Sequence, residues 1–173
     1  MELGKVYFFT ATIIDWKPLL KEDRYKDVII ESLQYLTGNK CIRVFAFVIM
    51  PNHIHLIWEL QRLNGKEMPH ASLMKYTSHK FLQMIRADKP EMLLIYKAES
   101  GKRNHQFWKR DALPVELYSD KVFEQKMDYI HHNPVQDKWC LADEPAMYKY
   151  SSAGFYETGH DRFGFLTHCS EWQ

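Results

Sequence analysis

The sequence predicts an α+β fold: a ferredoxin-like (split β-α-β) antiparallel sheet with helices on one face and an added C-terminal helix. Strand-like and helix-like segments alternate in the order β-α-β-β-α-β, and one more helical segment follows them. The chain has 173 residues, which is enough for one domain with a full hydrophobic core. Hydrophobic residues make up 46% and charged residues 26%, a composition that excludes disordered and collagen-like chains.

The first half of the chain is expected to supply three strands and one helix. Residues 6–14 are rich in β-branched and aromatic side chains, which favours a strand. Apolar side chains recur at steps of three and four over residues 23–37, which predicts an amphipathic helix. Residues 41–50 are almost continuously apolar and predict a central strand. Pro51 then interrupts the ladder, and residues 53–60 form the next strand.

The second half is expected to supply two helices and a last strand. Residues 71–87 carry apolar side chains at helical spacing. Residues 106–118 are expected to contain a short strand or hairpin. A third helix begins near Ser119, a good N-cap residue, and ends near Asn133, because Pro134 disfavours helical geometry at the residue before it.

Domain organisation and location follow from simple features of the sequence. We expect residues 1–135 to form the main domain and residues 136–173 an aromatic extension that packs on it. Cys41, Cys140 and Cys169 are odd in number and form no Cys-x-x-Cys pair, which argues against a zinc ribbon and a disulfide framework. No apolar run reaches the length of a membrane helix and no secretory pattern is present, so we expect a cytoplasmic protein without membrane contact.

Two histidines form the first candidate site. His53 and His55 are two residues apart on a predicted strand, so both project from the same face. A rise of roughly 3.3 Å per residue places their Cβ atoms about 6 to 7 Å apart, from where two imidazoles could bind one metal ion. His-x-His is a common pattern, and two polar side chains on a half-exposed strand would explain it as well.

A tyrosine and an asparagine form the second candidate site. Tyr129 and Asn133 are four residues apart on the third predicted helix, so they share one of its faces. An exposed tyrosine could be a nucleophile, and an asparagine one turn later could be an oxygen ligand. Taken singly, a surface tyrosine and a residue at a helix end explain the same pattern.

Charge is distributed unevenly along the chain. The net charge is only +1, but residues 75–111 contain nine lysines and arginines against four acidic residues. This excess predicts a local surface for a polyanion, or else a solvated helix face followed by a charged loop.

Together the two candidate sites resemble a known family. Residues 47–58, Phe-Val-Ile-Met-Pro-Asn-His-Ile-His-Leu-Ile-Trp, closely resemble the histidine-hydrophobe-histidine (HUH) block of the single-tyrosine transposases. Residues 128–135, Asp-Tyr-Ile-His-His-Asn-Pro-Val, are similar to the nucleophile helix of the REP-associated tyrosine transposases. The likeness extends from the first strand to about Tyr156. The sequence departs from the family after Val135, where small residues are usual and residues 136–139 read Gln-Asp-Lys-Trp.

The resemblance implies a metal-dependent DNA transposase with its catalytic domain at residues 1–135. His53, His55 and Asn133 would bind a divalent metal, Mg²⁺ or Mn²⁺. Tyr129 would attack single-stranded DNA near a hairpin and leave a 5′-phosphotyrosine and a free 3′-hydroxyl. A phenol, with an ordinary pKa near 10, is a poor nucleophile at pH 7, so a cation on the phosphate would help by neutralising the developing charge.

The remaining expectations concern DNA, assembly and alternative functions. The basic residues expected to contact DNA are Lys75, Lys80, Arg86, Lys102, Arg103, Lys109, Arg110 and Lys126. Related enzymes include dimers that exchange their nucleophile helices, so a homodimer and a monomer both remain open. Two other functions also remain open: a domesticated nucleic-acid-binding protein without cleavage activity, and a metal-dependent hydrolase without a tyrosine nucleophile.

Overall fold

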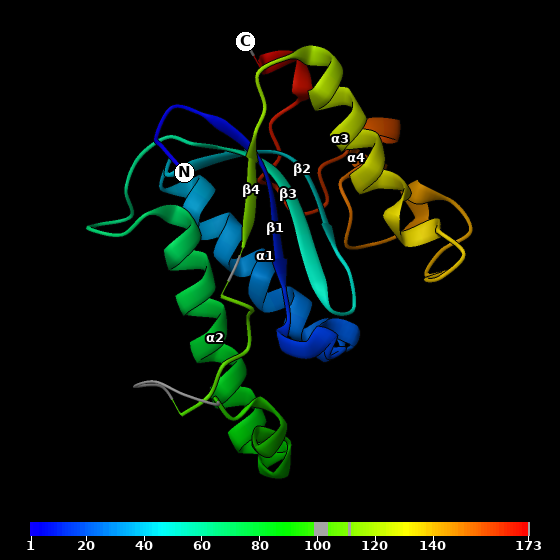
Figure 1. Cartoon of the computed structure of the whole chain (residues 1–173). Helices are drawn as coiled ribbons and strands as arrows, with labels where there is room; N and C mark the ends of the chain where they lie inside the picture. Colours follow the sequence, from blue (N-terminus) through cyan, green and yellow to red (C-terminus); the bar gives the residue numbers. More distant parts are fainter. Residues whose placement is uncertain (99–103, 111, 173) are drawn as a thin grey trace.

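The computed structural model describes residues 1–98, 104–110 and 112–172. Within these residues, one antiparallel sheet has the strand order β2-β3-β1-β4 (Figure 1). Its strands are β1 (Val6–Thr12), β2 (Ile42–Ile49), β3 (His53–Leu60) and β4 (Leu113–Glu116). The helices are α1 (Asp23–Gly38), α2 (Pro69–Asp88), α3 (Asp120–His132) and α4 (Ala153–Thr158). This order and topology confirm the predicted α+β, ferredoxin-like fold.

Short 3-10 helices, which the sequence pattern did not predict, connect these elements. They are Ile14–Trp16, Leu19–Lys21, Pro90–Tyr96, Asn133–Val135, Pro145–Met147 and Cys169–Glu171. The strand predicted over residues 106–118 is confined to β4. Trp108 lies outside it because its indole nitrogen donates to Thr77 Oγ1 of α2 at 2.9 Å, while its backbone forms an isolated bridge with Ile13.

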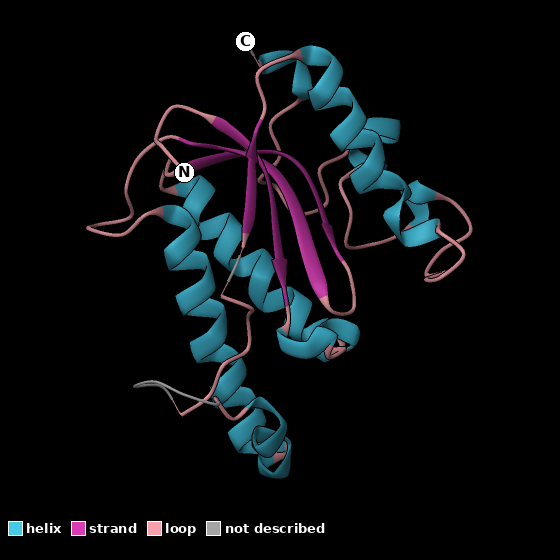
Figure 2. Cartoon of the chain, in the orientation of Figure 1, coloured by secondary structure: helices cyan, strands magenta, loops and turns pink. Residues whose placement is uncertain are grey.

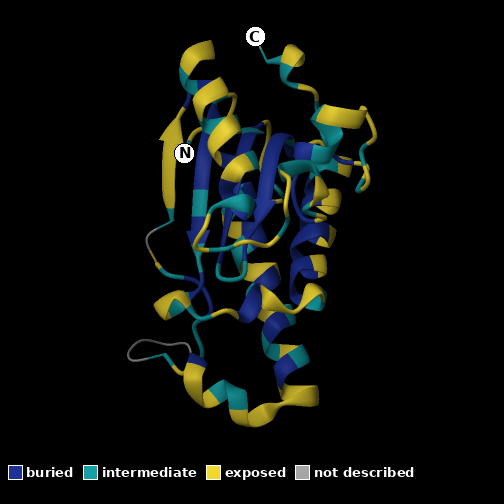
Figure 3. Cartoon of the chain, turned by 90° about the vertical axis from the view of Figure 1, so that its right-hand side faces the viewer, coloured by how far each residue is buried: buried dark blue, intermediate teal, exposed yellow. Residues whose placement is uncertain are grey.

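The sheet is covered on both faces (Figure 2). Phe9, Leu56 and Trp58 belong to the larger core, which packs against α1 and α2. Phe8 and Ile57 belong to a second core on the opposite face, beneath α3. Since β2 and β3 lie between these two cores, they are almost wholly buried, whereas all four residues of the edge strand β4 are exposed (Figure 3).

The C-terminal segment runs along the outer edge of β2. The amides of Ile49 and Ser152 donate to the carbonyls of Tyr150 and Phe47 at 2.9 and 3.0 Å, and the Thr167 amide donates to Val44 at 2.8 Å. The segment therefore has a structural role: its backbone pairs with groups at a sheet edge that would otherwise be unpaired.

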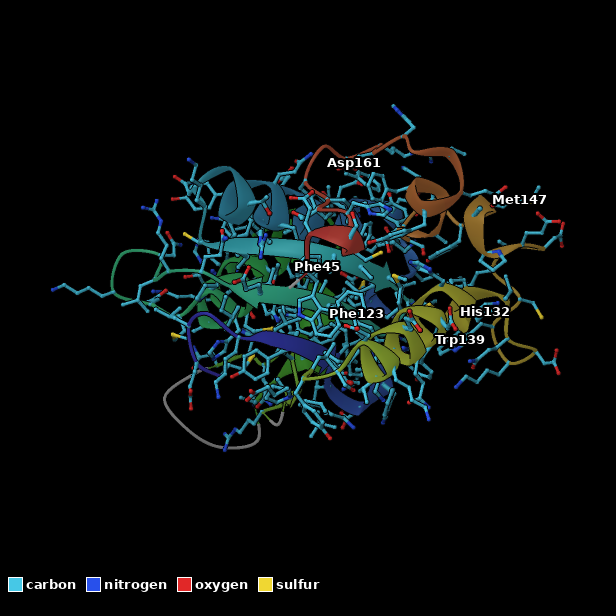
Figure 4. All side chains as sticks on the ribbon, turned by 90° about the horizontal axis from the view of Figure 1, so that it is seen from above. Phe45, Phe123, His132, Trp139, Met147 and Asp161 are labelled. Carbon is cyan, nitrogen blue, oxygen red and sulfur yellow. The ribbon has the colours of Figure 1, made fainter. Side chains whose placement is uncertain are left out.

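Helix α3 is fixed at its start by a cap and by aromatic packing. The Ser119 side chain accepts the Val122 amide, as expected for an N-cap residue. Phe123 is 2% exposed and meets Phe45 of β2 edge-on, with ring centroids 5.8 Å apart (Figure 4). On its other side Phe123 stacks on Trp172, with centroids 4.3 Å apart, so the C-terminal end of the chain lies beside the start of α3 (Figure 1).

Among residues 1–98, 104–110 and 112–172, neither α2 nor any other helix combines the length and the apolar character of a membrane span.

Replacement of Phe123 tests the packing of α3. Phe123→Ala should lower the free energy of unfolding by about 3–5 kcal/mol, because the loss of a buried aromatic ring leaves a cavity between α3 and β2. Urea denaturation measures the change. Tyr118→Ala, at a side chain 82% exposed just before α3, should change the same quantity by less than about 0.5 kcal/mol. Equal losses in the two variants would contradict the packing role of Phe123.

Candidate active site

Two buried histidines occupy the start of β3, on the face covered by α3. His53 is 6% exposed and His55 is 5% exposed, and their ring centroids are 4.7 Å apart. The pairing of β1 with β3 places Thr12 opposite His53 and Thr10 opposite His55. The predicted same-face geometry is thus present, and it lies inside the fold, at a covered part of the sheet.

Hydrogen bonds to Nδ1 orient both imidazoles. Nδ1 of His53 donates to Asn52 Oδ1 at 2.7 Å, and Nδ1 of His55 lies 2.8 Å from Thr10 Oγ1. The amide of Asn52 is itself fixed, because its Nδ2 donates to the Trp16 carbonyl at 3.1 Å. Partners of this kind hold the ring and leave the lone pair of Nε2 for a metal ion.

Both histidines are neutral at physiological pH. Burial, and then the positive charge of Lys138, lower the pKa of His53 to about 4. Burial is also the main cause at His55, whose pKa falls to about 3, with smaller contributions from His53, Lys126 and Lys138. Neutral imidazole is the form that binds metals, so this environment keeps both rings ready for coordination without a proton to displace.

Helix α3 brings Tyr129 to the same place. The Tyr129 ring meets His55 edge-on at a centroid distance of 5.2 Å and Phe8 at 6.0 Å. Phe8 in turn stacks on His55 at 5.3 Å. Tyr129 is 42% exposed, so the residue touches the buried histidine pair while remaining accessible to a ligand from solvent.

Asn133, one turn beyond Tyr129, is 1% exposed. Its Oδ1 and the Nε2 of His55 are both buried, and neither has a hydrogen-bond partner in the described part of the chain. Buried polar atoms are rarely left unpaired, and each such atom costs about 1–3 kcal/mol. Two unpaired electron-pair donors on neighbouring elements, β3 and the end of α3, are what a cation site requires.

The donor set fits a divalent ion only if Asn133 takes part. Among the His, Cys, Asp and Glu side chains of the described residues, no group of three or more could hold a metal. Two imidazole nitrogens and one amide oxygen form a mixed set that suits Mg²⁺ or Mn²⁺ and that zinc or nickel could also occupy. His53, His55 and Asn133 are therefore the residues that could hold the ion.

His131 connects the second half of α3 to the sheet edge. Its Nε2 lies 2.8 Å from Ser152 Oγ, which accepts the Phe47 amide of β2 at 3.0 Å. Burial lowers the pKa of His131 to about 4, so this link does not depend on a charge at pH 7. From the sequence alone, His131 was indistinguishable from a polar residue at a helix end, because its partner is twenty-one residues away.

The basic residues predicted to contact DNA separate into several locations. Lys126 lies at the site, with its Nζ 4.8 Å from the Phe8 ring centroid and 6.0 Å from that of Tyr129. Lys75, Arg86, Lys109 and Arg110 line a groove beside α2. Lys80 lies on α2 with its Nζ 5.6 Å from the Tyr76 ring, and Lys102 and Arg103 lie outside the described residues.

Two tryptophans lie beside the histidines and were not predicted from the sequence as part of the site. The rings of Trp16 and Trp139 lie 6.1 and 5.8 Å from that of His53, measured between centroids. Trp139 follows α3 closely in the chain, where the sequence departs from the family that it resembles, and that departure was the available signal (Figure 4). For Trp16 the signal was weaker, a tryptophan in a polar turn after the first strand.

Comparison with known proteins agrees with the fold. No protein-family model and no curated protein matches the sequence. Among solved structures, a REP-associated tyrosine transposase bound to a REP hairpin aligns with a TM-score of 0.63 over 96% of this chain and 87% of that chain. The chain has the fold of that transposase. The two sequences are 17% identical, so the likeness establishes the fold alone.

A second solved structure, of a protein provisionally described as a transposase from Deinococcus radiodurans R1, is 15% identical to this chain. The alignment covers 75% of this chain and 95% of that chain, with a TM-score of 0.45.

Removal of the Asn52 amide tests the orientation of His53. Asn52→Ala should weaken Mn²⁺ binding about 10- to 100-fold, because His53 then loses the partner that fixes its ring and its tautomer. Isothermal titration calorimetry of the protein with MnCl₂ measures the affinity. Asn39→Ala, at the far end of α1, should bind Mn²⁺ as the unmodified protein does. Unchanged affinity in Asn52→Ala would contradict the positioning role of Asn52.

Proposed function

We propose that this protein is a metal-dependent tyrosine transposase that cleaves and rejoins single-stranded DNA near hairpins. One observation carries the proposal. The accessible Tyr129 ring contacts His55, one of two buried neutral histidines, and His55 Nε2 and Asn133 Oδ1 are both buried without partners. A purely structural cluster would not combine an open nucleophile with unpaired metal donors.

The proposed reaction is a phosphoryl transfer to Tyr129. The phenolic oxygen attacks the scissile phosphorus, the bond from phosphorus to the 3′-oxygen breaks, and a 5′-phosphotyrosine forms. The phenol loses its proton to solvent, and the departing 3′-oxygen takes one up, so charge and atoms balance. The reverse attack by a 3′-hydroxyl rejoins DNA without a nucleotide cofactor, because the covalent link conserves the energy of the phosphodiester.

The remaining side chains position the reactants. His53, His55 and Asn133 would hold a divalent ion, Mg²⁺ or Mn²⁺, which when bound neutralises charge developing on the phosphate. The Phe8 ring supports both His55 and Tyr129, which keeps nucleophile and ligand in one geometry. Lys126 would attract the phosphate to Tyr129, since its ammonium group lies over the same two aromatic rings.

Contacts within one chain support a nucleophile that acts in its own subunit. Tyr129 already meets His55 of the same chain at 5.2 Å between centroids. Packing at Phe123 and the link from His131 to Ser152 hold α3 in this place. A monomer could thus contain a whole active site, although this arrangement is also compatible with a homodimer.

Two observations support hairpin DNA with single-stranded flanks as the substrate. The structurally similar REP-associated transposase is bound to a REP hairpin, which makes hairpin DNA the first substrate to test. Lys126 would contact a phosphate at the site, and the basic side chains that line the groove beside α2 would contact more distant phosphates, although the net charge of the chain is only +1.

Tyr129→Phe is the direct test of the nucleophile. The variant should form no covalent adduct with a labelled hairpin oligonucleotide in Mn²⁺, because the attacking oxygen is gone, and it should bind the same oligonucleotide as tightly as before. Denaturing gel electrophoresis detects the adduct, and fluorescence anisotropy measures binding. Tyr118→Phe, at an exposed tyrosine near the start of the same helix, should form the adduct normally.

The products distinguish the alternatives. Adduct that persists in Tyr129→Phe would refute the assignment of the nucleophile. Binding without cleavage by the unmodified protein would favour a domesticated nucleic-acid-binding protein. Turnover of DNA with no trapped intermediate would favour a metal-dependent hydrolase.

Metal dependence has its own prediction. Treatment with EDTA should abolish adduct formation, and Mn²⁺ should restore it in the unmodified protein but not in His55→Ala or Asn133→Ala, which lack a donor atom. The same denaturing gel provides the measurement. His160→Ala, at an exposed histidine after α4, is the matched control and should respond to Mn²⁺ like the unmodified protein. Full activity in EDTA would contradict the proposed metal dependence.

A further inference from the structure

A large aromatic side chain stands exposed at the edge of the candidate site. Trp16 is 55% exposed, and its ring meets that of His53 edge-on at 6.1 Å between centroids. It belongs to neither core cluster of the protein. An exposed tryptophan next to proposed metal ligands contributes little to the core, so its position calls for another explanation.

The backbone holds Trp16 in an unfavourable conformation. Asp15 and Trp16 have φ angles of 53° and 57°, in the left-handed region that side chains other than glycine rarely adopt. The turn is kept in place by its neighbours: the Ile14 amide donates to the Phe107 carbonyl at 2.7 Å, and Asn52 donates to the Trp16 carbonyl at 3.1 Å. Strained residues of this kind cluster at ligand-binding sites, where the surrounding structure maintains them.

Asn52 connects this turn directly to the histidines. Its Nδ2 binds the Trp16 carbonyl, and its Oδ1 binds Nδ1 of His53. One side-chain amide therefore binds both the backbone of the residue that carries the exposed indole and the ring of a proposed metal ligand. A molecule that reaches the ion would meet the Trp16 ring at a defined distance from it.

A cation lies over the same indole. The Nζ of Lys109 is 4.6 Å from the Trp16 ring centroid, and the Lys109 amide donates to the Thr12 carbonyl at the end of β1 at 2.8 Å. An aromatic face beside a lysine is the combination with which proteins bind single strands: the ring stacks on a base, and the ammonium group binds the adjoining phosphate.

Lys109 also lines a groove that leads away from the site. The groove has a volume of about 910 Å³ and lies between α2 and a wall formed by Ala98, residues 104–110 and Ala112. Its lining includes Lys75, Arg86, Arg110 and the rings of Phe107 and Trp108. Basic and aromatic side chains that line one groove fit the sugar-phosphate backbone of a single strand.

We propose that Trp16 is a stacking platform for an unpaired base beside the scissile phosphate, that Lys109 binds the next phosphate, and that the strand continues in the groove along α2. This subsite deepens the proposed function and depends on it, because it assumes that the strand bound at the histidines is single-stranded DNA. Duplex DNA does not fit the assignment, since its base faces are already stacked on one another.

Binding experiments in the Tyr129→Phe background test the platform without interference from cleavage. The probe is a fluorescein-labelled hairpin oligonucleotide with single-stranded flanks, measured by anisotropy in Mn²⁺. Trp16→Ala should weaken binding about 5- to 100-fold, the usual loss for one stacked base, and Trp16→Phe should retain most of the affinity. Alanine keeps the Cβ atom of tryptophan, so the strain of the turn is the same in both.

Two further variants sharpen the test. Tyr35→Ala, at a tyrosine 57% exposed on α1, across the sheet from the histidines, is the matched control and should bind as the parent does. Lys109→Ala should reduce the slope of log affinity against log salt concentration by roughly one, because one phosphate contact is lost.

The outcomes separate this inference from the proposed function. If Trp16→Ala binds as tightly as Tyr35→Ala, or if Trp16→Ala weakens blunt duplex binding by the same factor, the stacking platform is wrong. If the unmodified protein forms no adduct but binding still depends on Trp16, the transposase assignment fails and the subsite stands. If adduct forms and binding does not depend on Trp16, the stacking platform is wrong and the transposase assignment stands.

Discussion

Two electron-pair donors, His55 Nε2 and Asn133 Oδ1, are buried without partners, and this constraint governs the rest of the molecule. At roughly 1–3 kcal/mol each, they cost about 2–6 kcal/mol that a protein selected for stability alone would recover by substitution with apolar residues. The fold must keep both atoms buried despite that cost. A bound cation would satisfy both atoms. The proposed metal binding would therefore explain why the protein retains two unpaired buried atoms that lower its stability.

The architecture maintains this arrangement from three directions. The register of β1 against β3 puts Thr10 opposite His55, so a hydroxyl meets the ring across the ladder. Asn52, in the turn before β3, holds His53. Helix α3 brings Tyr129 and Asn133 down onto the same face, anchored by Phe123 at one end and by the contact of His131 with Ser152 at the other. A shift of β3 by one residue would turn both imidazoles into the opposite core, which makes the register a functional constraint.

The sequence predicted what short-range patterns determine. Period-two and period-3.6 spacing located β3 and α3 closely, and they placed the histidine pair on one face and Tyr129 one turn before Asn133, because these relations depend on local backbone geometry. Strand β4 was placed less well, since Trp108 is held by a contact with α2 that no local pattern encodes. Contacts between distant segments were also beyond reach: Trp16 beside His53, and His131 beside Ser152, exist only after the chain has folded.

The charges around the site link cation binding to DNA binding. The three proposed ligands are all neutral, and the described residues offer no cluster of carboxylates to replace them. Lys126 and Lys138 are close enough to lower the pKa of His55 through their positive charge, and they would oppose a divalent cation in the same way. A site of this kind holds a cation weakly by itself. The phosphate of a bound strand supplies the missing negative charge, so each ligand should raise the affinity of the other by the same factor, as linkage requires. The ion would then be bound tightly only when DNA occupies the site. The exposed Tyr129 would therefore be activated only in the presence of its substrate.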